Sequence, residues 1–307
     1  MSLIILTDGL RLGLIYAIMA LGIFISFRIL NIPDLTVDGS FTLGMAVFAV
    51  FAMDGRPFLG LLLAPLAGLA AGCVTGLLLT KLKVQPILAG ILTMTGLYSI
   101  NLLVMKESPN ISLFNSGTVF SLAETILPGF LKPYVNFLFP ALVLAALTLL
   151  LLLFLRTQLG MSLRATGDNE AMVRASSISA DRMKILGLAL ANALVSFSGA
   201  MMAQYQEFAD ISFGIGMVVV GLASIIIGEA FLGRRSIVCN VLAAILGSVL
   251  YQIVISLVFS TGLNTLFMKL LSAVILTVAL AVPLVKDAVK KGKSGRAAVK
   301  RGEPNDA

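Results

Sequence analysis

Carboxylates and hydroxyls stand close together at residues 31–40, within sequence that is otherwise apolar. The stretch reads NIPDLTVDGS and contains Asp34, Thr36 and Asp38. Pro33 lacks an N–H and therefore interrupts a helix. An aspartate at membrane depth costs roughly 2.5–3.5 kcal/mol on insertion scales, so each one must face water, protein or a polar cavity. The stretch either lines such a cavity within a membrane or forms a solvated turn outside it.

Polar side chains also run in a line through the apolar segment at 86–105. Thr93, Thr95 and Asn101 follow Pro86, which is tolerated at the start of a helix because its N–H would have no partner there. Such side chains can bond between helices, at about 0.6 kcal/mol each, or they can contact a solute. Both interpretations remain open for each of the three.

Glu229 is an acid near the end of the apolar run at 215–232. It could act as a gate or relay residue within the membrane. Alternatively, it pairs with Arg234 or Arg235, which follow at the membrane boundary. An acid within a membrane span is a candidate functional residue under both interpretations.

The sequence lacks the motifs for ATP binding, metal binding and hydrolysis. The chain has no His, no phosphate-binding G-x-x-x-x-G-K-[ST] loop and no H-E-x-x-H motif, so we expect no bound ATP, no metal and no hydrolytic site in it. Cys73 and Cys239 both lie in apolar segments, where we expect packed, unpaired thiols. These absences argue against an enzyme.

The elements that must position the polar groups are membrane-spanning helices. The chain is 59% hydrophobic and 12% charged, with a mean hydropathy of +1.04, which predicts an all-α polytopic membrane protein. We predict about nine spans, at 9–27, 37–52, 59–80, 86–105, 136–155, 185–205, 215–232, 236–258 and 266–285. The span at 37–52 is short and would need a broken or tilted helix. Residues 1–285 thus form one transmembrane domain.

The distribution of Lys and Arg predicts the orientation. Placing the N-terminus outside and the C-terminus inside puts most of the basic residues on the cytoplasmic side, as the positive-inside rule requires. The net charge of +7 therefore indicates a membrane topology rather than binding of nucleic acid. The Lys- and Gly-rich residues 286–307 are expected to form a disordered cytoplasmic tail that touches lipid. The long external connection at 107–135 contains a weakly apolar piece near 119–127 that could form a short helix.

A faint internal repeat relates the two halves of the chain. The triplet Asp34, Leu35 and Thr36 is similar to Asp210, Ile211 and Ser212 at 210–212, and each triplet follows one span and precedes a Gly-bearing span. By the predicted orientation, the first triplet lies toward the inside and the second toward the outside. This predicts an inverted-topology repeat, about 9–105 and 185–285, with an extra span at 136–155 and a substrate path at the interface.

The long polar segment at 156–184 is the main interruption between the spans. Asp168 is a candidate N-cap, and Ala171, Ala175 and Ile178 follow at i, i+4 and i+7 with Met172 beside them, which predicts a short amphipathic helix. A basic linker with such a helix suggests a docking surface for another protein. An ordinary positive-inside loop and a helix lying on lipid headgroups are the alternatives.

This segment resembles the cytoplasmic coupling segment of ABC importer permeases of the branched-chain amino acid and ribose class. The resemblance rests on the runs GMSLRATGDNEA at 160–171 and SSISADR at 176–182. It implies that the segment fits a cleft in a separate ATPase subunit. Ser177 stands where the family usually has Gly, so the turn before Ile178 is the point of departure from the family. The residues implied in coupling are Gly160, Arg164, Ala165, Gly167, Asn169, Ala171, Met172, Ala175, Ile178 and Arg182.

The resemblance extends to residues 31–44 and 84–96. Ribose-type permeases carry a D-L-S-V-G motif where this chain has DLTVDG, and the string NIPDLTVDGSF resembles a subgroup linked to aromatic amino acids or unassigned. The fourth span is also similar, with Gln85 in place of a family Pro. We therefore assign a translocation pathway to Asp34, Thr36, Asp38, Thr93, Thr95, Asn101, Asp210 and Ser212, with Glu229 as a candidate gate.

Together these features predict the permease subunit of an ATP-driven importer in the bacterial cytoplasmic membrane. The resemblance implies a small polar solute, an amino acid or a related compound. The expected partners are cytoplasmic ATPase subunits that bind the ATP, an external substrate-binding protein or lipoprotein, a second copy of the chain and membrane lipid. The alternative is a stand-alone, ion-coupled secondary transporter that uses Asp34, Asp38 or Glu229.

Overall fold

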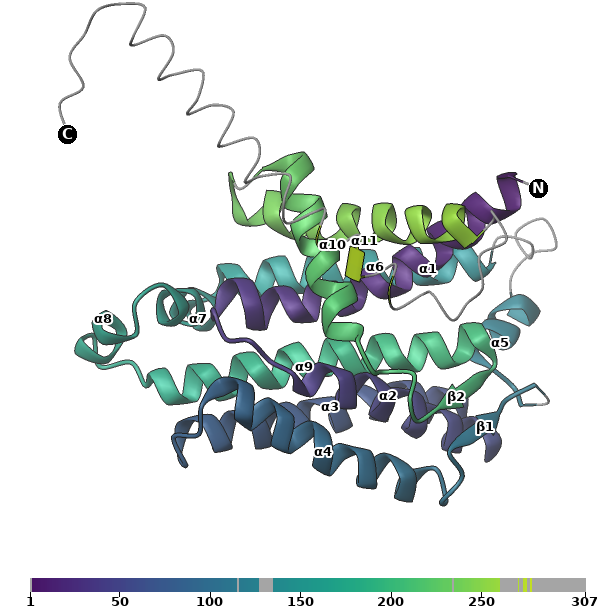
Figure 1. Cartoon of the computed structure of the whole chain (residues 1–307), viewed down its shortest axis with the longest axis horizontal. Helices are drawn as coiled ribbons and strands as arrows, with labels where there is room; N and C mark the ends of the chain where they lie inside the picture. Colours follow the sequence, from purple (N-terminus) through teal and green to yellow (C-terminus); the bar gives the residue numbers. More distant parts are fainter. Residues whose placement is uncertain are drawn as a thin grey trace, which may run out of the picture.

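The computed structural model describes residues 2–114, 116–126, 135–233 and 235–259, together with residues 270, 273, 274 and 277. These residues are largely helical (Figure 1). The helices are α1 (Ser2–Ile23), η1 (a π-helix, Phe24–Ile29), α2 (Thr36–Met53), α3 (Pro57–Thr80), α4 (Pro86–Val104), α5 (Val119–Ile126), α6 (Val135–Arg156), α7 (Gln158–Asp168), α8 (Glu170–Ala175), α9 (Ala180–Gln206), α10 (Met217–Leu232) and α11 (Ile237–Phe259). Two short strands, β1 (Asn110–Ser112) and β2 (Phe208–Asp210), pair antiparallel with Asn110 opposite Asp210.

The described helices agree with the first eight predicted spans. Seven helices in this part of the chain are long and apolar enough to cross a membrane, and α10 is a shorter apolar helix. The ninth predicted span, at 266–285, and the predicted tail at 286–307 fall outside the described residues, apart from four isolated positions. The chain is thus a polytopic helical membrane protein, and the small β1–β2 sheet is an exception to the predicted all-α class.

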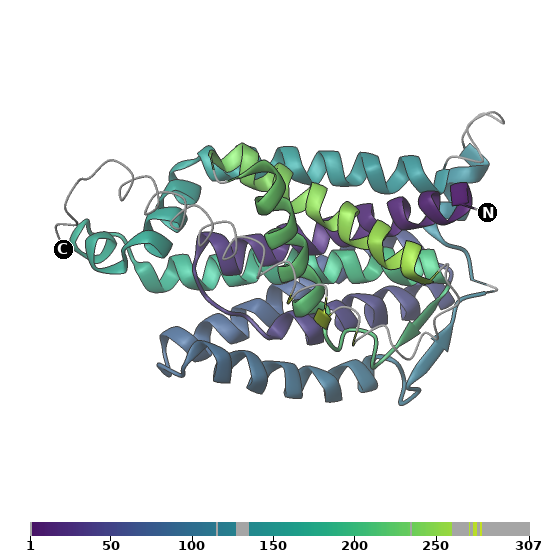
Figure 2. The same ribbon diagram turned by 45° about the horizontal axis from the view of Figure 1, so that its top comes forward.

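Helix α9 is the centre of the bundle. Figures 1 and 2 show it between α1 on one side and the α2–α3 pair on the other, and it packs against all three. Gly68, Gly72 and Gly76 recur at every fourth residue along the face of α3 that meets α9. A Cβ added at Gly72 would lie 2.7 Å from the Cα of Ala189, so the two backbones approach each other as in other small-residue interfaces between membrane helices.

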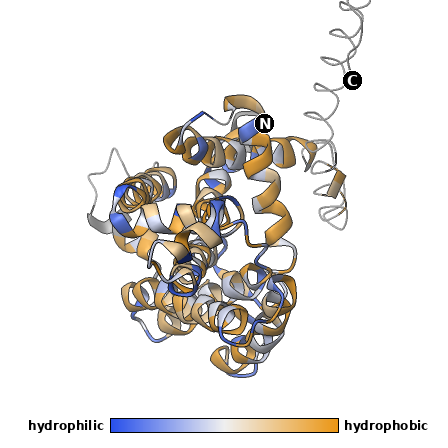
Figure 3. Cartoon of the chain, turned by 90° about the vertical axis from the view of Figure 1, so that its left-hand side faces the viewer, coloured by the Kyte–Doolittle hydropathy of each residue, from blue (hydrophilic) through white to orange (hydrophobic). Residues whose placement is uncertain are grey.

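The outer helices present apolar side chains to their surroundings. Leu62 on α3, Leu103 on α4 and Leu142 on α6 are each more than half exposed. Figure 3, viewed along the bundle, shows that the helices are largely hydrophobic. Such surfaces suit contact with lipid tails rather than water.

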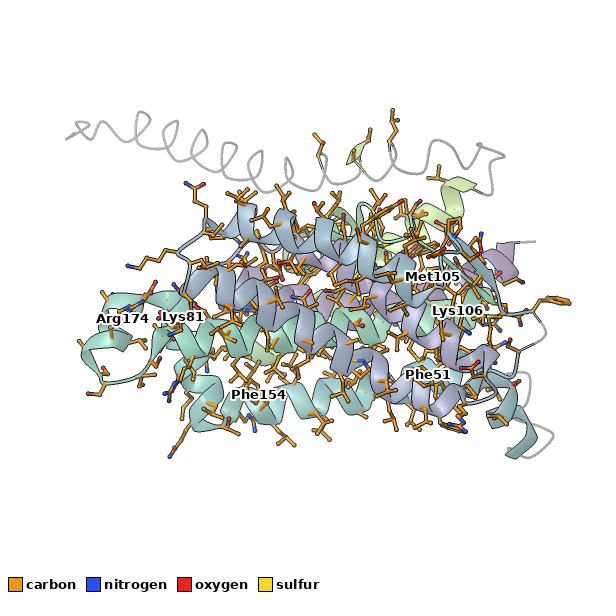
Figure 4. All side chains as sticks on the ribbon, turned by 90° about the horizontal axis from the view of Figure 1, so that it is seen from below. Phe51, Lys81, Met105, Lys106, Phe154 and Arg174 are labelled. Atoms are coloured by element: carbon orange, nitrogen blue, oxygen red, sulfur yellow. The ribbon has the colours of Figure 1, made fainter. Side chains whose placement is uncertain are left out.

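The two ends of the bundle carry different elements. Helices α7 and α8 project at one end, and the N-terminus and the β1–β2 sheet lie at the other (Figure 1). Figure 4 places Lys81 and Arg174 at the α7–α8 end and Lys106 at the opposite end. Basic residues therefore occur at both ends, and the positive-inside orientation remains a prediction.

The connection between α4 and α6 folds onto the end of the bundle that carries β2. Strand β1 within it pairs with β2, and the expected short helix near 119–127 is present as α5. The buried side chain of Gln204 accepts a hydrogen bond from the backbone N–H of Val119, at 3.1 Å, and so caps the start of α5. The described part of this connection covers the bundle end rather than standing apart from it.

Candidate functional site

Asp34 lies inside the bundle, which excludes a solvated turn at this position. One of its carboxylate oxygens accepts from the backbone N–H of Thr36 at 2.9 Å, and the other accepts from the side-chain amide of Asn192 on α9 at 2.7 Å. The hydroxyl of Thr36 bonds that of Thr75 at 2.7 Å, and Thr75 donates to Thr93 at 3.0 Å. All five side chains are buried. Three predicted pathway residues, Asp34, Thr36 and Thr93, therefore bond neighbouring helices to one another.

Asp38 joins the two halves of the chain. It lies in the first turn of α2, and its two oxygens accept from the backbone N–H groups of Gly216 at 2.8 Å and Val218 at 2.9 Å. These N–H groups lie at the start of α10, where a helix carries partial positive charge and lacks backbone partners. The carboxylate therefore caps the start of α10 through Gly216, which lies 178 residues further along the chain.

The two related triplets adopt the same local geometry. In residues 34–36 and 210–212, the aspartate accepts a hydrogen bond from the backbone N–H two residues later. Asn31 and Glu207, each three residues before its aspartate, have left-handed φ values of 55° and 57°. Figure 1 shows that α1 and α9 run in opposite directions and that each following connection returns toward the middle of the bundle. The resemblance in sequence between the halves thus extends to their backbone conformation.

A cavity of about 210 Å³ opens beside Asp38, between α2, α4 and the loop before α10. Its walls include the predicted pathway residues Asp38, Thr95 and Asn101. The side-chain amide of Asn101 donates to the carbonyl oxygen of Gly39 at 3.2 Å, and Asn101 is only 1% exposed. Of the remaining pathway residues, Ser212 lines a separate cavity of about 480 Å³ bordered by α1, α10 and α11, and Asp210 is half-buried in β2.

Glu229 pairs with a residue that sequence reasoning did not consider. Arg28, on the π-helical turn η1, donates through its Nε and one terminal nitrogen to both carboxylate oxygens of Glu229. The side chains are 23% and 6% exposed, respectively. Of the partners predicted from proximity, Arg235 is exposed and Arg234 lies outside the described residues. The candidate gate therefore connects the end of the first span to the end of α10.

The polar segment at 156–184 forms two short helices, and its predicted cap is wrong. Asp168 is the last residue of α7, and Asn169 caps α8 by accepting from the backbone N–H of Met172 at 3.0 Å. The predicted apolar stripe is also shortened, because α8 ends at Ala175, before Ile178. Ser177 follows with a left-handed φ of 61°, a conformation that favours Gly.

The ten predicted coupling residues have different surroundings. Gly160 and Gly167 pack against the bundle, where an added Cβ would overlap the carbonyl oxygens of Phe154 and Ile29, respectively. Arg164, Ala165 and Ile178 are half-buried, and Asn169 is exposed at its cap. The exposed members on or after α8 are Ala171, Met172, Ala175 and Arg182. The exposed α8 surface agrees with a docking role, which remains a prediction.

An ion-pair network braces α8 against α9. Glu170 accepts from Lys184 at 2.6 Å and from Arg174 at 2.8 Å, and Arg174 also donates to Asp181 at 2.8 Å. The hydrogen bond from Lys184, followed by that from Arg174, lowers the pKa of Glu170 below its ordinary value. Exposed pairs of this kind contribute roughly 0.2–1 kcal/mol each, so they orient α8 more than they stabilise the protein.

The segment also contacts the start of the 31–40 stretch. The side-chain amide of Asn31 donates to the carbonyl oxygen of Gly167 at 3.0 Å, and Gly167 itself lies against Ile29 at the end of η1. The projecting helices are therefore connected to the residues that lead to Asp34 and Asp38.

Comparison with known proteins agrees with a membrane transport component. The model of the family described as "Branched-chain amino acid transport system / permease component" matches residues 5–280. The chain belongs to this family and is thus a permease component of the ABC transporter type. No solved structure matches it.

Three curated relatives illustrate the range of the family. The chain is 41% identical over 235 residues to the "Tyrosine transport system permease protein" of Clostridioides difficile, covering 76% of each chain. It is 36% identical over 225 residues to "Uncharacterized protein RP368" of Rickettsia prowazekii, covering 73% of this chain and 77% of the relative. It is 27% identical over 234 residues to the "Ribose import permease protein RbsC" of Escherichia coli K12, covering 75% of this chain and 71% of the relative.

Proposed function

We propose that the chain is the membrane-spanning subunit of an ATP-driven importer of the bacterial inner membrane, which carries an amino acid or a closely related solute. The observation that carries this proposal is the exposed pair of short helices, α7 and α8, standing beyond one end of the bundle (Figure 1). Met161 and Met172 on these helices are 52% and 56% exposed. Such apolar exposure on a polar segment suits a protein contact. The partner is a cytoplasmic ATPase subunit that binds the ATP.

The choice of solute is supported by the relative at 41% identity, whose name describes tyrosine transport. Tyrosine is therefore the first solute to test. An external binding protein or lipoprotein would deliver it to the end of the bundle that carries the β1–β2 sheet.

Coupling would pass from the ATPase through α7 to the 31–40 stretch. A push on α7 acts on Gly167, which contacts Ile29 and is held by Asn31. The following residues lead to Asp38, whose carboxylate holds the start of α10. Because packed elements move as units, this contiguous set of contacts would shift α10 relative to α2.

A homodimer is the form in which we expect the chain to work. The cavity beside Asp38 opens at the flank of α4, where Thr95 and Tyr98 are exposed, rather than at the centre of the bundle. Polar side chains at membrane depth face protein or a water-filled space. A second copy against this flank would enclose such a space.

The competing function is ion-coupled transport without an ATPase. It would use Asp34, Asp38 or Glu229, and each of these carboxylates accepts strong hydrogen bonds from the protein. A coupling ion or proton would have to displace those donors, which costs free energy. We therefore favour the ATP-driven function.

The test combines association with transport. In the proposed complex, Arg164→Glu or Ala171→Trp abolishes co-purification of the ATPase, while the protein still inserts into membranes. Arg56→Glu, a change of the same charge after α2 at the other bundle end, is the matched control and retains the ATPase. Uptake of L-tyrosine into vesicles should require ATP and resist ionophores. Uptake that persists without ATP and stops with an ionophore would establish the ion-coupled alternative.

A further inference from the structure

A groove runs between α3 and α4, with Leu43 and Val47 of α2 as its third side. Its volume is about 500 Å³. Among the described residues that line it, only Thr93 has a polar side chain, and that hydroxyl already bonds the hydroxyl of Thr75 and the carbonyl oxygen of Ala89. The groove therefore suits an apolar occupant better than water, which needs several polar partners.

Small residues leave this space open to the surroundings of the bundle. Ala70 and Ala71 line it on α3, and Gly96 lines it on α4, where an added Cβ would meet nothing within 4 Å. Val74 and Leu92, from the two helices that form its walls, are each 50% exposed. Atoms that face an empty gap lose their van der Waals contacts, so within a membrane an apolar group from outside should fill the groove.

The groove is about as long as one leaflet of a bilayer is thick. Its lining extends along α3 from Ala67 to Leu78 and along α4 from Leu92 to Val104. At 1.5 Å per residue these stretches are about 17 and 18 Å long, and half of the ~30 Å hydrocarbon core is about 15 Å. This length matches one extended acyl chain of a lipid.

One end of the groove is basic. Leu78 lines it near the end of α3, and Lys81 follows three residues later on the same face of the helix. The N–H of Val84 donates to the carbonyl oxygen of Leu78 at 3.1 Å, which holds Lys81 and Lys83 in a tight turn beside the groove. Both lysines are exposed, and neither forms an ion pair with another described residue.

The other end of the groove has no such excess of positive charge. Val104 lines it, and the oppositely charged Lys106 and Glu107 follow. The turn at 80–86, by contrast, contains two lysines and no acid. Lysines near a membrane surface attract anionic lipid, and basic pockets between membrane helices bind acidic headgroups. Charge therefore favours a lipid with its headgroup at the Lys81 end, which Figure 4 places with α7 and α8.

We propose that this groove is a binding site for one acyl chain of an anionic phospholipid. The chain lies between α3 and α4, and Lys81 and Lys83 bind the phosphate of the headgroup. The lipid comes from the leaflet at the α7–α8 end, which is the cytoplasmic leaflet in the predicted orientation. Its chain fills the space beside Thr93, where Thr75 joins α3 to α4.

Photolabelling in nanodiscs tests the site. The full-length chain is placed in discs of equal parts anionic phosphatidylglycerol and zwitterionic phosphatidylethanolamine, with a trace of either lipid carrying a diazirine at the end of one acyl chain. Labelled peptides are mapped by mass spectrometry, and α6, whose apolar side chains are also exposed, is the reference for lipid without a fixed site. The phosphatidylglycerol probe should label 67–78 and 92–104 in excess of α6, and the phosphatidylethanolamine probe should show a smaller excess. Soluble glycerol 3-phosphate, which has the charge but no chain, should not reduce the labelling.

Substitutions separate the chain from the headgroup. Gly96→Leu directs a side chain into the groove and should remove the excess, whereas Ser99→Leu, on the exposed face of α4 outside the groove, should retain it. Lys81→Gln and Lys83→Gln should each lower the preference for phosphatidylglycerol by about fivefold, the effect of one lysine near a membrane surface. Lys106→Gln, at the other end of the groove, is the matched control and should leave the preference unchanged.

The assignment fails if α6 and the groove segments are labelled equally, because lipid then only surrounds the protein. An excess that survives Gly96→Leu places the chain elsewhere, and a preference that survives the loss of both lysines refutes the headgroup contact. A preference that is lost in Lys106→Gln reverses the lipid, and displacement by glycerol 3-phosphate makes the site one for a soluble phosphate. If the groove segments stay unlabelled and Gly96→Leu dissociates a dimer, a second copy of the chain occupies the groove instead.

Discussion

The pairing of Arg28 with Glu229 can be measured by a double-mutant cycle. We consider Arg28→Met, Glu229→Gln and the two changes combined. Each single change removes one member of the ion pair and leaves the charge of the other. Breaking a buried ion pair in this way costs about 3–5 kcal/mol. Because Arg28 is 23% exposed and Glu229 only 6%, water relieves the arginine more than the glutamate.

The structure therefore predicts unequal single effects. Arg28→Met removes the arginine and leaves the more buried charge, the carboxylate of Glu229, in place. This change should destabilise the protein by about 3 kcal/mol or more. Glu229→Gln should cost less, since the remaining guanidinium reaches solvent. The double variant has no unpaired charge, so its loss should be smaller than the sum of the single losses by at least about 1 kcal/mol.

The assay is reversible unfolding in bicelles, followed by steric trapping. The pair of Arg11 and Asp8, 3.4 Å apart on α1, has side chains that are 27% and 46% exposed, more than those of Arg28 and Glu229. It serves as a control, and its cycle should give less than about 1 kcal/mol. If the losses at Arg28 and Glu229 add to within about 0.5 kcal/mol, the two side chains do not interact and the assigned contact between the spans is refuted.

Two further predictions concern packing and pH. Gly72→Ala should force α3 away from α9 and cost about 1–3 kcal/mol by the same unfolding assay, whereas Gly96→Ala, with nothing within 4 Å of its added Cβ, should not destabilise. The pKa of Glu170 is lowered from 4.5 by Lys184 and then Arg174, so its contribution to holding α8 is complete above pH 4.5 and is lost as the pH falls through the lower folded value. A spin label on α8 should become more mobile over that acidic range, and the transition should be absent in Glu170→Gln.

Membrane length and polarity were sufficient to predict most of the helices. A lipid environment leaves backbone groups no partner outside the protein, so an apolar run of about 20 residues must form a helix. This argument located the first eight spans, including α10 with its acid at Glu229. The runs at 160–171 and 176–182 also identified the family, because they preserve residue types at fixed spacing.

Local boundaries depended on contacts beyond the local sequence. Asp168 and Asn169 are both good capping residues, and sequence favoured the first. In the structure Gly167 is held against Ile29 and bonded by Asn31, which keeps the preceding residues in α7 and leaves Asn169 to begin α8. The residues next to the cap are therefore in contact with a part of the chain more than 130 residues away, which the local sequence does not reveal.

The sequence by itself determined that Asp34, Asp38 and Glu229 lie among apolar residues and must therefore have partners. Only the tertiary structure decided which partners they have. Asp34 bonds Asn192 within the helix packing, Asp38 caps α10 beside a cavity, and Glu229 is paired with Arg28. Spacing along the chain carries no information about these contacts, because they depend on which helix faces meet when α1, α2, α9 and α10 pack together.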